Sequence, residues 1–249
     1  MSRIKIRFYA QLNDFITPER QGKTFDHSFN GSASVKDVIE SLGVPHTEVD
    51  LILIDGNSAP FSDLLEGGES VAVYPAFKNL DLGDTSKVRP MPLSEYRFVL
   101  DSHLGKLAAY LRMLGFDAIY RNMFDDADIA AISARDKRIL LTCDHGLLKR
   151  KEVVYGCFIR SKLPALQLKE VLTRFDLFSK IRPFTRCMKC NGILEPVDKE
   201  SIISRLPAKV DEFYDEFSKC RDCGQLYWPG THYERMKELI SNVAHMDIL

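Results

Sequence analysis

The 249-residue sequence has no apolar run long enough to cross a membrane. Its first residues, MSRIKIRFYA, alternate charged and apolar side chains and lack the apolar core of a signal peptide. Strong charge of one sign is also missing, because the net charge is only −1. These absences exclude a membrane-spanning or strongly polyanionic or polycationic chain, and they predict a cytoplasmic protein with no membrane partner.

The sequence also lacks the cysteine pattern of a disulfide-bonded protein. Of the six cysteines, four form two C-x-x-C pairs, and Cys143 and Cys157 lie in apolar segments that read as strands. Secreted disulfide frameworks do not have this pattern. The sequence therefore predicts one metal site and two core thiols in a reducing compartment.

The small net charge hides an uneven distribution. Residues 1–80 carry 7 basic and 11 acidic side chains, residues 95–183 carry 16 and 11, and residues 184–249 carry 9 and 11. The middle block is basic although it contains several aspartates. A basic surface around an acidic focus suits a polyanionic substrate at a metal site, and solvated helix faces explain the same excess equally well.

The first 76 residues have the pattern of a small β-grasp fold. Alternating apolar residues predict a strand at 4–8, residues 24–29 can pair with it, and Ser34 is a candidate N-cap for a helix over 35–42. Strands at 51–54 and 70–74 follow. The order ββαββ predicts an N-terminal α+β domain over residues 1–78.

Residues 3–76 resemble the small sulfur carriers of thiamine and molybdopterin synthesis, through VKDVIESLGVP, VDLILIDG and LLEGGESVAVYP. Those carriers end in a free Gly-Gly, whereas Gly67-Gly68 is followed here by another strand. The resemblance thus favours a structural or docking domain over sulfur transfer. Residues 79–94 contain Pro90 and Pro92 with little periodicity, and they are expected to be a linker.

Strand and helix patterns alternate through residues 95–182. Continuous apolar strands predict a parallel sheet covered by helices on both faces, and sites in such sheets lie beyond the carboxyl ends of the strands. Asp101 follows the strand 98–100, and Asp144 follows the strand 139–142. Asp125, Asp126 and Asp128 lie at the start of the helix between them.

Each of these aspartates has an ordinary structural explanation as a helix cap or a partner of the helix dipole. Together, three converging carboxylates would repel one another unless a cation lay between them. Carboxylate oxygens favour Mg²⁺ or Mn²⁺. The sequence therefore predicts a metal site formed by Asp101, Asp144 and the acidic helix start, where Asp125, Asp126 and Asp128 are all candidates.

The segments LDSHLGKLAAYLRMLGFDAIY and DDADIAAISARDKRILLTCDHGLLKR resemble the Mut-seven C-terminal RNase-like family, a branch of the PIN-domain nucleases, and the likeness runs over about residues 95–240. The resemblance implies a PIN-like α/β/α domain and a metal-dependent ribonuclease. By position, Asp101 matches the first-strand acid, Asp126 the helix acid, and Asp144 the acid of the T-x-D element. Many PIN nucleases have a fourth acid after the next strand, which this chain lacks.

Basic side chains near these acids are candidates for contacts with RNA phosphates. Lys106 lies one helical turn after Asp101, and Lys149, Arg150 and Arg160 follow Asp144. For each of them a solvated surface position explains the sequence as well.

Residues 183–249 hold the two cysteine pairs, Cys187-x-x-Cys190 and Cys220-x-x-Cys223, separated by 29 residues. Four thiolates in this arrangement predict a structural, tetrahedral Zn²⁺ in a zinc ribbon, with a helical insertion over 199–217. Gly192 and Gly224 are expected in tight turns. Tyr227 and Trp228 either pack in the ribbon core or stack on RNA bases.

The sequence thus predicts four parts: a β-grasp domain over 1–78, a linker over 79–94, a PIN-like nuclease domain over 95–182 and a zinc-ribbon module over 183–249. The expected function is Mg²⁺- or Mn²⁺-dependent hydrolysis of RNA, such as tRNA or another structured RNA, with a protein partner at the β-grasp domain. The alternatives are a non-catalytic RNA-binding or adaptor protein, or a docking partner of sulfur-transfer enzymes.

Overall fold

A computed structural model describes residues 1–76 and 83–245 of the chain; the first part of the expected linker, residues 79–82, lies outside this range. The chain forms two compact units. Unit 1 comprises Met1–Ser94 and Asp126–Phe158, and unit 2 comprises Glu95–Asp125 and Ile159–Leu249. The four predicted domain ranges remain predictions.

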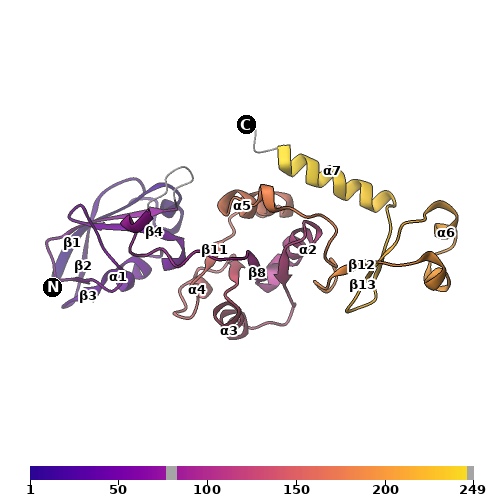
Figure 1. Ribbon diagram of the computed structural model, residues 1–249. Coiled ribbons are helices and arrows are strands. Elements are labelled where there is room, and N and C mark those ends of the chain that lie inside the picture. Colours follow the sequence, from indigo (N-terminus) through magenta and orange to yellow (C-terminus); the bar gives the residue numbers. More distant parts are fainter. Residues whose placement is uncertain (77–82, 246–249) are drawn as a thin grey trace. The chain divides into compact units, whose positions relative to one another are not determined.

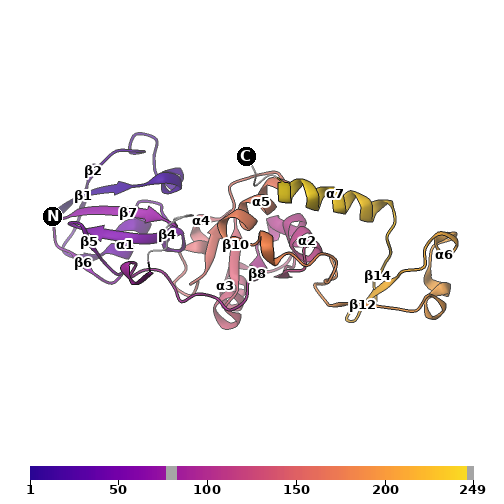
Figure 2. The same cartoon turned by 45° about the horizontal axis from the view of Figure 1, so that its top comes forward.

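The N-terminal part of unit 1 contains the predicted helix and the four predicted strands, and a fifth, short strand extends the sheet (Figure 1). The sheet order is β2-β1-β7-β4-β5, and the central pair, β1 and β7, is parallel. Figure 2 shows these strands side by side. The elements are β1 Ser2–Phe8, η1 Ala10–Phe15, β2 Phe25–Phe29, β3 Ala33–Ser34, α1 Val35–Ser41, η2 His46–Glu48, β4 Val49–Ile54, β5 Asn57–Ser58, β6 Leu64–Leu65, β7 Ser70–Pro75 and η3 Gly83–Thr85.

Apolar and charged side chains alternate along β1, and the apolar ones form part of the core beneath the sheet. Ile4, Ile6 and Phe8 are almost completely buried, whereas Lys5 points to the solvent face. The Ser34 hydroxyl accepts a hydrogen bond from the Asp37 amide and caps α1, as predicted.

Gly67 and Gly68 form an internal turn between β6 and β7. Both have positive φ, +117° and +99°, and the Gly68 amide donates to the Arg3 carbonyl at 2.7 Å. The glycine pair is therefore a built-in turn of the sheet. Beyond β7, Arg89 donates to the Asp50 carboxylate at 2.9 Å, so this part of the expected linker packs on the β-grasp domain.

The rest of unit 1 contains α3 Asp126–Asp136, β10 Ile139–Thr142, α4 His145–Leu148 and β11 Gly156–Phe158. Strands β10 and β11 are parallel. Cys157 is buried as expected, but Cys143 is exposed, because β10 ends at Thr142 and the chain turns outward there. The prediction of a second core thiol was wrong.

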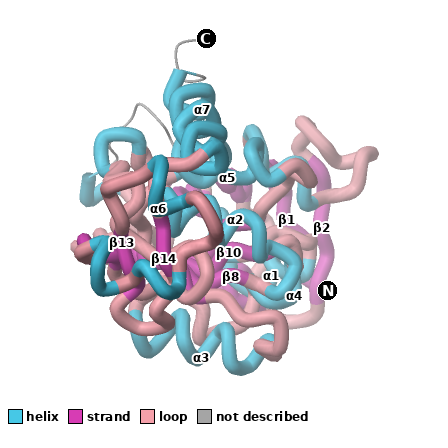
Figure 3. The backbone as a smooth tube through the Cα atoms, turned by 90° about the vertical axis from the view of Figure 1, so that its right-hand side faces the viewer, coloured by secondary structure: helices cyan, strands magenta, loops and turns pink. Residues whose placement is uncertain are grey.

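Unit 2 begins with β8 Arg97–Leu100, η4 Ser102–Leu104, α2 Gly105–Met113 and β9 Asp117–Ile119, where β8 and β9 are parallel. It continues with α5 Pro164–Arg174, η5 Phe178–Lys180, β12 Leu194–Pro196, η6 Lys199–Ser201, η7 Ile203–Arg205, α6 Val210–Phe213, β13 Ser218–Cys220, β14 Leu226–Tyr227 and α7 Thr231–His245. Strands β12, β13 and β14 form an antiparallel sheet. Helix α7 contacts α5, and Figure 3 shows the two helices together in cyan.

The predicted fold class is confirmed: an α/β chain with an N-terminal β-grasp sheet, parallel strands with helices, and a four-cysteine ribbon. The 199–217 insertion contains only short helical turns rather than one helix. Across the described residues, no helix is both long and apolar enough to cross a membrane.

Candidate functional site

The four predicted zinc ligands converge in unit 2. The sulfur atoms of Cys187, Cys190, Cys220 and Cys223 all lie within 4.8 Å of one another. The Cys187–Cys223 distance is 3.6 Å and the Cys190–Cys220 distance is 3.4 Å. Tetrahedral zinc with Zn–S bonds of 2.3 Å separates its sulfurs by about 3.8 Å. The quartet can therefore hold a metal such as zinc.

Each cysteine pair is shaped by a short backbone turn. The Cys187 amide donates to the Gly192 carbonyl at 2.7 Å, and the Gly224 amide donates to the Cys220 carbonyl at 3.0 Å. Gly224 has φ +70°, as a tight turn requires, but in the first pair Asn191 takes that conformation, with φ +76°. Gly192 is needed for space instead, because a Cβ there would lie 2.8 Å from the Cys220 sulfur.

The pKa values of Cys187 and Cys190 are shifted in opposite directions. Although partial burial opposes ionisation, hydrogen bonds from the Tyr227 hydroxyl and neighbouring amides lower the pKa of Cys187 to about 7. Burial is the main cause that raises the pKa of Cys190 to about 12. Four thiolates this close coexist only around a cation, which is the behaviour of a metal site.

Residues of α2 and β9 brace the first cysteine pair. Arg112 is only 5% exposed, and its guanidinium donates to the carbonyls of Met188 and Lys189, both at 3.1 Å. The Asn191 side chain bonds the Ala118 amide at 3.0 Å and Asp117 at 2.8 Å. The ribbon is thus joined to the strand that neighbours β8.

Asp101 lies directly after β8, as predicted, and is 8% exposed. It precedes η4, but its side chain makes no capping hydrogen bond to that helix. Its Oδ1 accepts from the Ser102 hydroxyl at 3.0 Å and lies 3.5 Å from His103 Nδ1. Helix capping therefore does not explain this buried carboxylate.

The turn after Asp101 is closed by Tyr120. Its hydroxyl donates to the Ser102 carbonyl at 2.8 Å. A Cβ on Gly105 would lie 2.7 Å from the same hydroxyl oxygen, so only glycine lets the ring approach. This packing fixes the backbone that carries Asp101.

The other acids are exposed, and most have local roles. Asp144 Oδ1 accepts from the Gly146 amide at 2.7 Å and caps α4, while the Asp144 amide donates to the Thr142 hydroxyl at 2.9 Å. Asp126 and Asp128 lie in the first turn of α3, and Asp125 precedes it. Asp101 and Asp125 belong to unit 2 and the others to unit 1, so convergence of Asp101, Asp126 and Asp144 remains a prediction.

The four side chains predicted to contact phosphates differ in their partners within the protein. Lys106 is exposed, with its ammonium 6.0 Å from the centroid of the Tyr110 ring. The Lys149 ammonium donates to the Glu40 carbonyl at 2.8 Å, so it is used inside unit 1. Arg150 Nε lies 3.8 Å from Glu152, and the Arg160 guanidinium lies 3.5 Å from Glu170.

Three residues of the centre were not foreseen: Arg112, Asn191 and the hydroxyl of Tyr227. The sequence did indicate that Arg112 is unusual, since it lies one helical turn after Ala108 on a helix face that is otherwise apolar. The long-range partners of Asn191 leave no local pattern.

The β-grasp sheet, the parallel strands with helices and the four-cysteine centre define a protein that combines a ubiquitin-like domain with an α/β region and a four-cysteine ribbon. Comparison with protein families gives the same answer: residues 96–240 match the Mut7-C RNAse domain, and residues 1–81 match the Mut7-C ubiquitin domain. The chain therefore belongs to the Mut7-C RNAse domain family. No curated protein and no solved structure matches it.

Proposed function

We propose that the chain is a metal-dependent ribonuclease that hydrolyses RNA phosphodiester bonds. The observation that carries this proposal is Asp101, a carboxylate that is only 8% exposed and lies at the carboxyl end of a parallel strand. Membership of a family described as RNases supports it. Burying an ionised carboxylate is costly unless a cation or hydrogen bonds compensate for the lost water.

The proposed catalytic site comprises Asp101, Asp126 and Asp144, with Mg²⁺ or Mn²⁺ as the cation. Three carboxylates match the oxygen ligands that these metals prefer. Such a cation polarises the phosphate and lowers the pKa of water. Asp101 would hold its position through the Tyr120-supported turn, and Asp144 through the Gly146 amide.

Zn²⁺ in the cysteine centre has a structural role in this proposal, because four thiolates leave no open ligand position. RNA is the proposed substrate, and the ubiquitin-like domain is proposed to contact a protein partner. Gly67-Gly68 lies in the turn between β6 and β7, so sulfur transfer through a terminal Gly-Gly is not part of the proposed function.

The test is incubation of the purified chain with total cellular RNA and Mn²⁺, followed by sequencing of the cut ends. Asp101→Asn is expected to lower the cleavage rate at least about 100-fold, since it removes a charged metal ligand. Asp176→Asn is the matched control: Asp176 is exposed with φ +50°, a conformation that asparagine tolerates. RNA binding without cleavage under either metal would instead support the adaptor alternative.

A further inference from the structure

A cavity of about 420 Å³ lies in unit 2 beside the cysteine centre. It is bounded by the ribbon strands and by α7, which is drawn in yellow in Figure 1. Its volume falls in the usual range for small-molecule sites. Aromatic rings supply much of the wall: Phe184, Phe217, Tyr227, Trp228 and Tyr233.

These rings are held in place by neighbours. Phe184 and Tyr233 pack with ring centroids 4.3 Å apart. The Tyr227 hydroxyl lies 3.1 Å from the Cys187 sulfur. Trp228 packs against the ribbon core that includes the buried Phe217. A preformed aromatic wall binds a planar ring at little cost in conformational entropy.

The polar lining is acidic. Asp215 and Glu216 contribute to the wall, and among the described residues that line the cavity none carries a positive charge. A phosphate group therefore does not belong inside. Carboxylate oxygens accept hydrogen bonds from ring N–H and amino groups, and guanine presents two such donors on its Watson–Crick edge.

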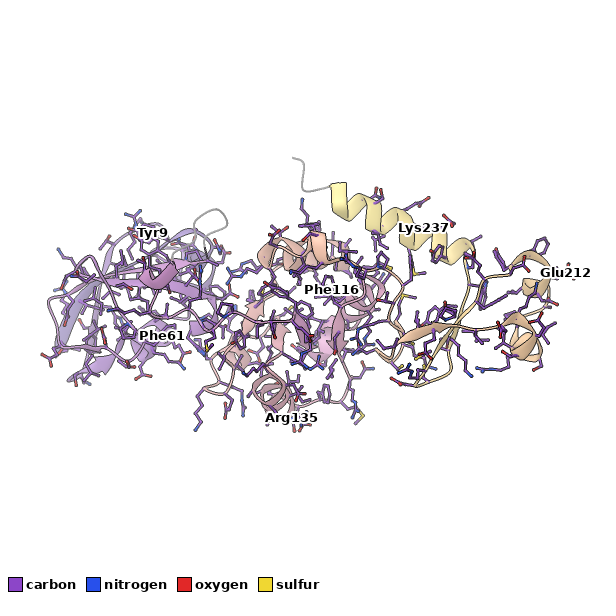
Figure 4. All side chains as sticks on the ribbon, viewed as in Figure 1. Tyr9, Phe61, Phe116, Arg135, Glu212 and Lys237 are labelled. Atoms are coloured by element: carbon purple, nitrogen blue, oxygen red, sulfur yellow. The ribbon has the colours of Figure 1, made fainter. Side chains whose placement is uncertain are left out.

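Basic side chains lie outside the lining. Lys199 pairs with Asp215 at 2.8 Å, and the Lys237 ammonium lies 4.7 Å from the centroid of the Tyr233 ring. Figure 4 labels Lys237 on α7. The ion pair with Lys199 partly neutralises the charge of Asp215, so the cavity attracts a cationic side chain less strongly. The carboxylate oxygens of Glu216 are still available as hydrogen-bond acceptors. Both lysines are suited to the phosphates that flank a bound base.

From this arrangement we propose that the cavity is a nucleobase subsite that holds an unstacked base of the RNA, with guanine preferred. The base stacks on the aromatic wall, and Glu216 accepts hydrogen bonds from the guanine N1–H and 2-amino groups. The identity of the ligand as RNA rests on the proposed function. The subsite would give the zinc ribbon a role in choosing the RNA.

The chain contains a single tryptophan, Trp228, so its fluorescence reports on this cavity alone. The experiment titrates the full zinc-loaded chain with GMP, IMP and UMP in the absence of Mg²⁺ and Mn²⁺. GMP is expected to quench the fluorescence saturably, IMP to bind more weakly because it lacks the 2-amino group, and UMP to bind most weakly.

Two variants test the roles of the wall. Glu216→Gln is expected to weaken GMP binding about tenfold and to remove most of the difference between GMP and IMP. Tyr233→Ala is expected to weaken all three nucleotides about tenfold through lost stacking. Glu212→Gln is the matched control, because Glu212 is exposed on α6, where Figure 4 labels it, and does not line the cavity.

Two outcomes would overturn the subsite. One is the absence of saturable quenching by any of the nucleotides. The other is tighter binding of N-acetyl-arginine amide than of GMP, which would assign the cavity to a cationic side chain of a protein. Because base binding needs neither Mg²⁺ nor Mn²⁺, it can persist when cleavage fails, and cleavage can persist when base binding fails.

Discussion

Arg112 links the cysteine centre to the α2 helix. Its buried guanidinium donates to the Ala118 carbonyl at 2.8 Å as well as to the carbonyls of Met188 and Lys189. Burial lowers its pKa, while the nearby Cys190 and Cys187 thiols oppose that shift. The planar guanidinium of Arg112 thus holds the backbone between Cys187 and Cys190. The negative charge of the nearby thiolates offsets the cost of burying the guanidinium.

Replacing Arg112 by lysine is expected to weaken zinc binding about tenfold to 100-fold, because a lysine cannot reproduce the three directed hydrogen bonds that support the ligands. Competition with a chromophoric chelator measures this change. Arg135→Lys is the control, since Arg135 is exposed and pairs with its neighbour Asp136. Equal zinc affinity in both variants would contradict the bracing role.

Glu69 supports the Gly67-Gly68 turn through its charge. Its carboxylate accepts from the amides of Glu66 at 2.8 Å and Gly67 at 2.9 Å. Partial burial opposes ionisation, but these amides outweigh it and lower the pKa of Glu69 below its ordinary value of 4.5. The stabilisation is therefore complete above pH 4.5 and is lost as the pH falls through the lowered value.

Glu69→Gln is expected to lower the free energy of unfolding by about 1 kcal/mol at pH 7. The deficit should shrink as the pH falls below 4.5, because the wild-type carboxylate then loses its charge too. Urea denaturation at both pH values measures the difference. Glu66→Gln, at an exposed neighbour, is the control; a deficit that persists unchanged in acid would disprove the charge effect.

The sequence revealed some site residues better than others for physical reasons. The cysteine quartet was predictable because each pair sets its own local turn. Asp101 was predictable because an apolar strand ends at it. The contact between the Lys149 ammonium and the Glu40 carbonyl was not predictable, because the two residues lie 109 positions apart. Such long-range partners leave no spacing pattern.

At the scale of elements, the two cysteine turns differ in how they use glycine. Gly224 supplies a positive φ, whereas Gly192 supplies space beside the Cys220 sulfur and the Asp222 carboxylate. The Asp222 side chain can swing away, but a sulfur that serves as a metal ligand cannot. Alanine is thus strained at both positions, for different reasons.

Gly192→Ala is expected to weaken zinc binding more than Gly224→Ala does. The first displaces a ligand atom, while the second costs only about 1 kcal/mol of backbone strain. Zinc affinity and the free energy of unfolding, measured on both variants, separate the two effects. A Gly192→Ala protein that binds zinc normally would show that the turn relaxes without moving Cys220.

Regular elements were predicted well where a local pattern defined them. Helices α1 and α3 began at the expected residues, since Ser34 caps the first and aspartates start the second. Strand β11 contains only Gly156–Phe158, and the 199–217 insertion contains only brief turns. In those segments tertiary contacts determine the structure more than periodicity does.

At the scale of the whole chain, unit 1 unites sequence segments more than 100 residues apart. The His46 ring lies 2.6 Å from the Glu40 carboxylate and 2.8 Å from the Val153 carbonyl. Phe15 packs against His145, the residue next to Asp144, with ring centroids 4.9 Å apart. The β-grasp domain therefore supports the segment that carries one of the proposed catalytic acids.

Glu48 is a buried acidic residue of this contact. It is 1% exposed, and its carboxylate accepts from the Phe158 amide at 2.7 Å. Substitution by alanine leaves that amide without this acceptor, at an expected cost of about 1–3 kcal/mol. If the domain supports β11, hydrogen exchange at the Phe158 amide should accelerate at least about fivefold in Glu48→Ala.

Exchange at the buried amides of β1 provides the internal control, because β1 belongs to the same unit but makes no contact with Glu48 in the described hydrogen bonds. Acceleration at Phe158 alone would mean that the contact opens locally, whereas acceleration at both places would mean that it stabilises all of unit 1. Unchanged exchange at Phe158 would contradict the support. Because α4 and Asp144 lie in the same segment, the first two outcomes both predict that Glu48→Ala lowers RNA cleavage. This is the route by which the ubiquitin-like domain would control the proposed ribonuclease activity.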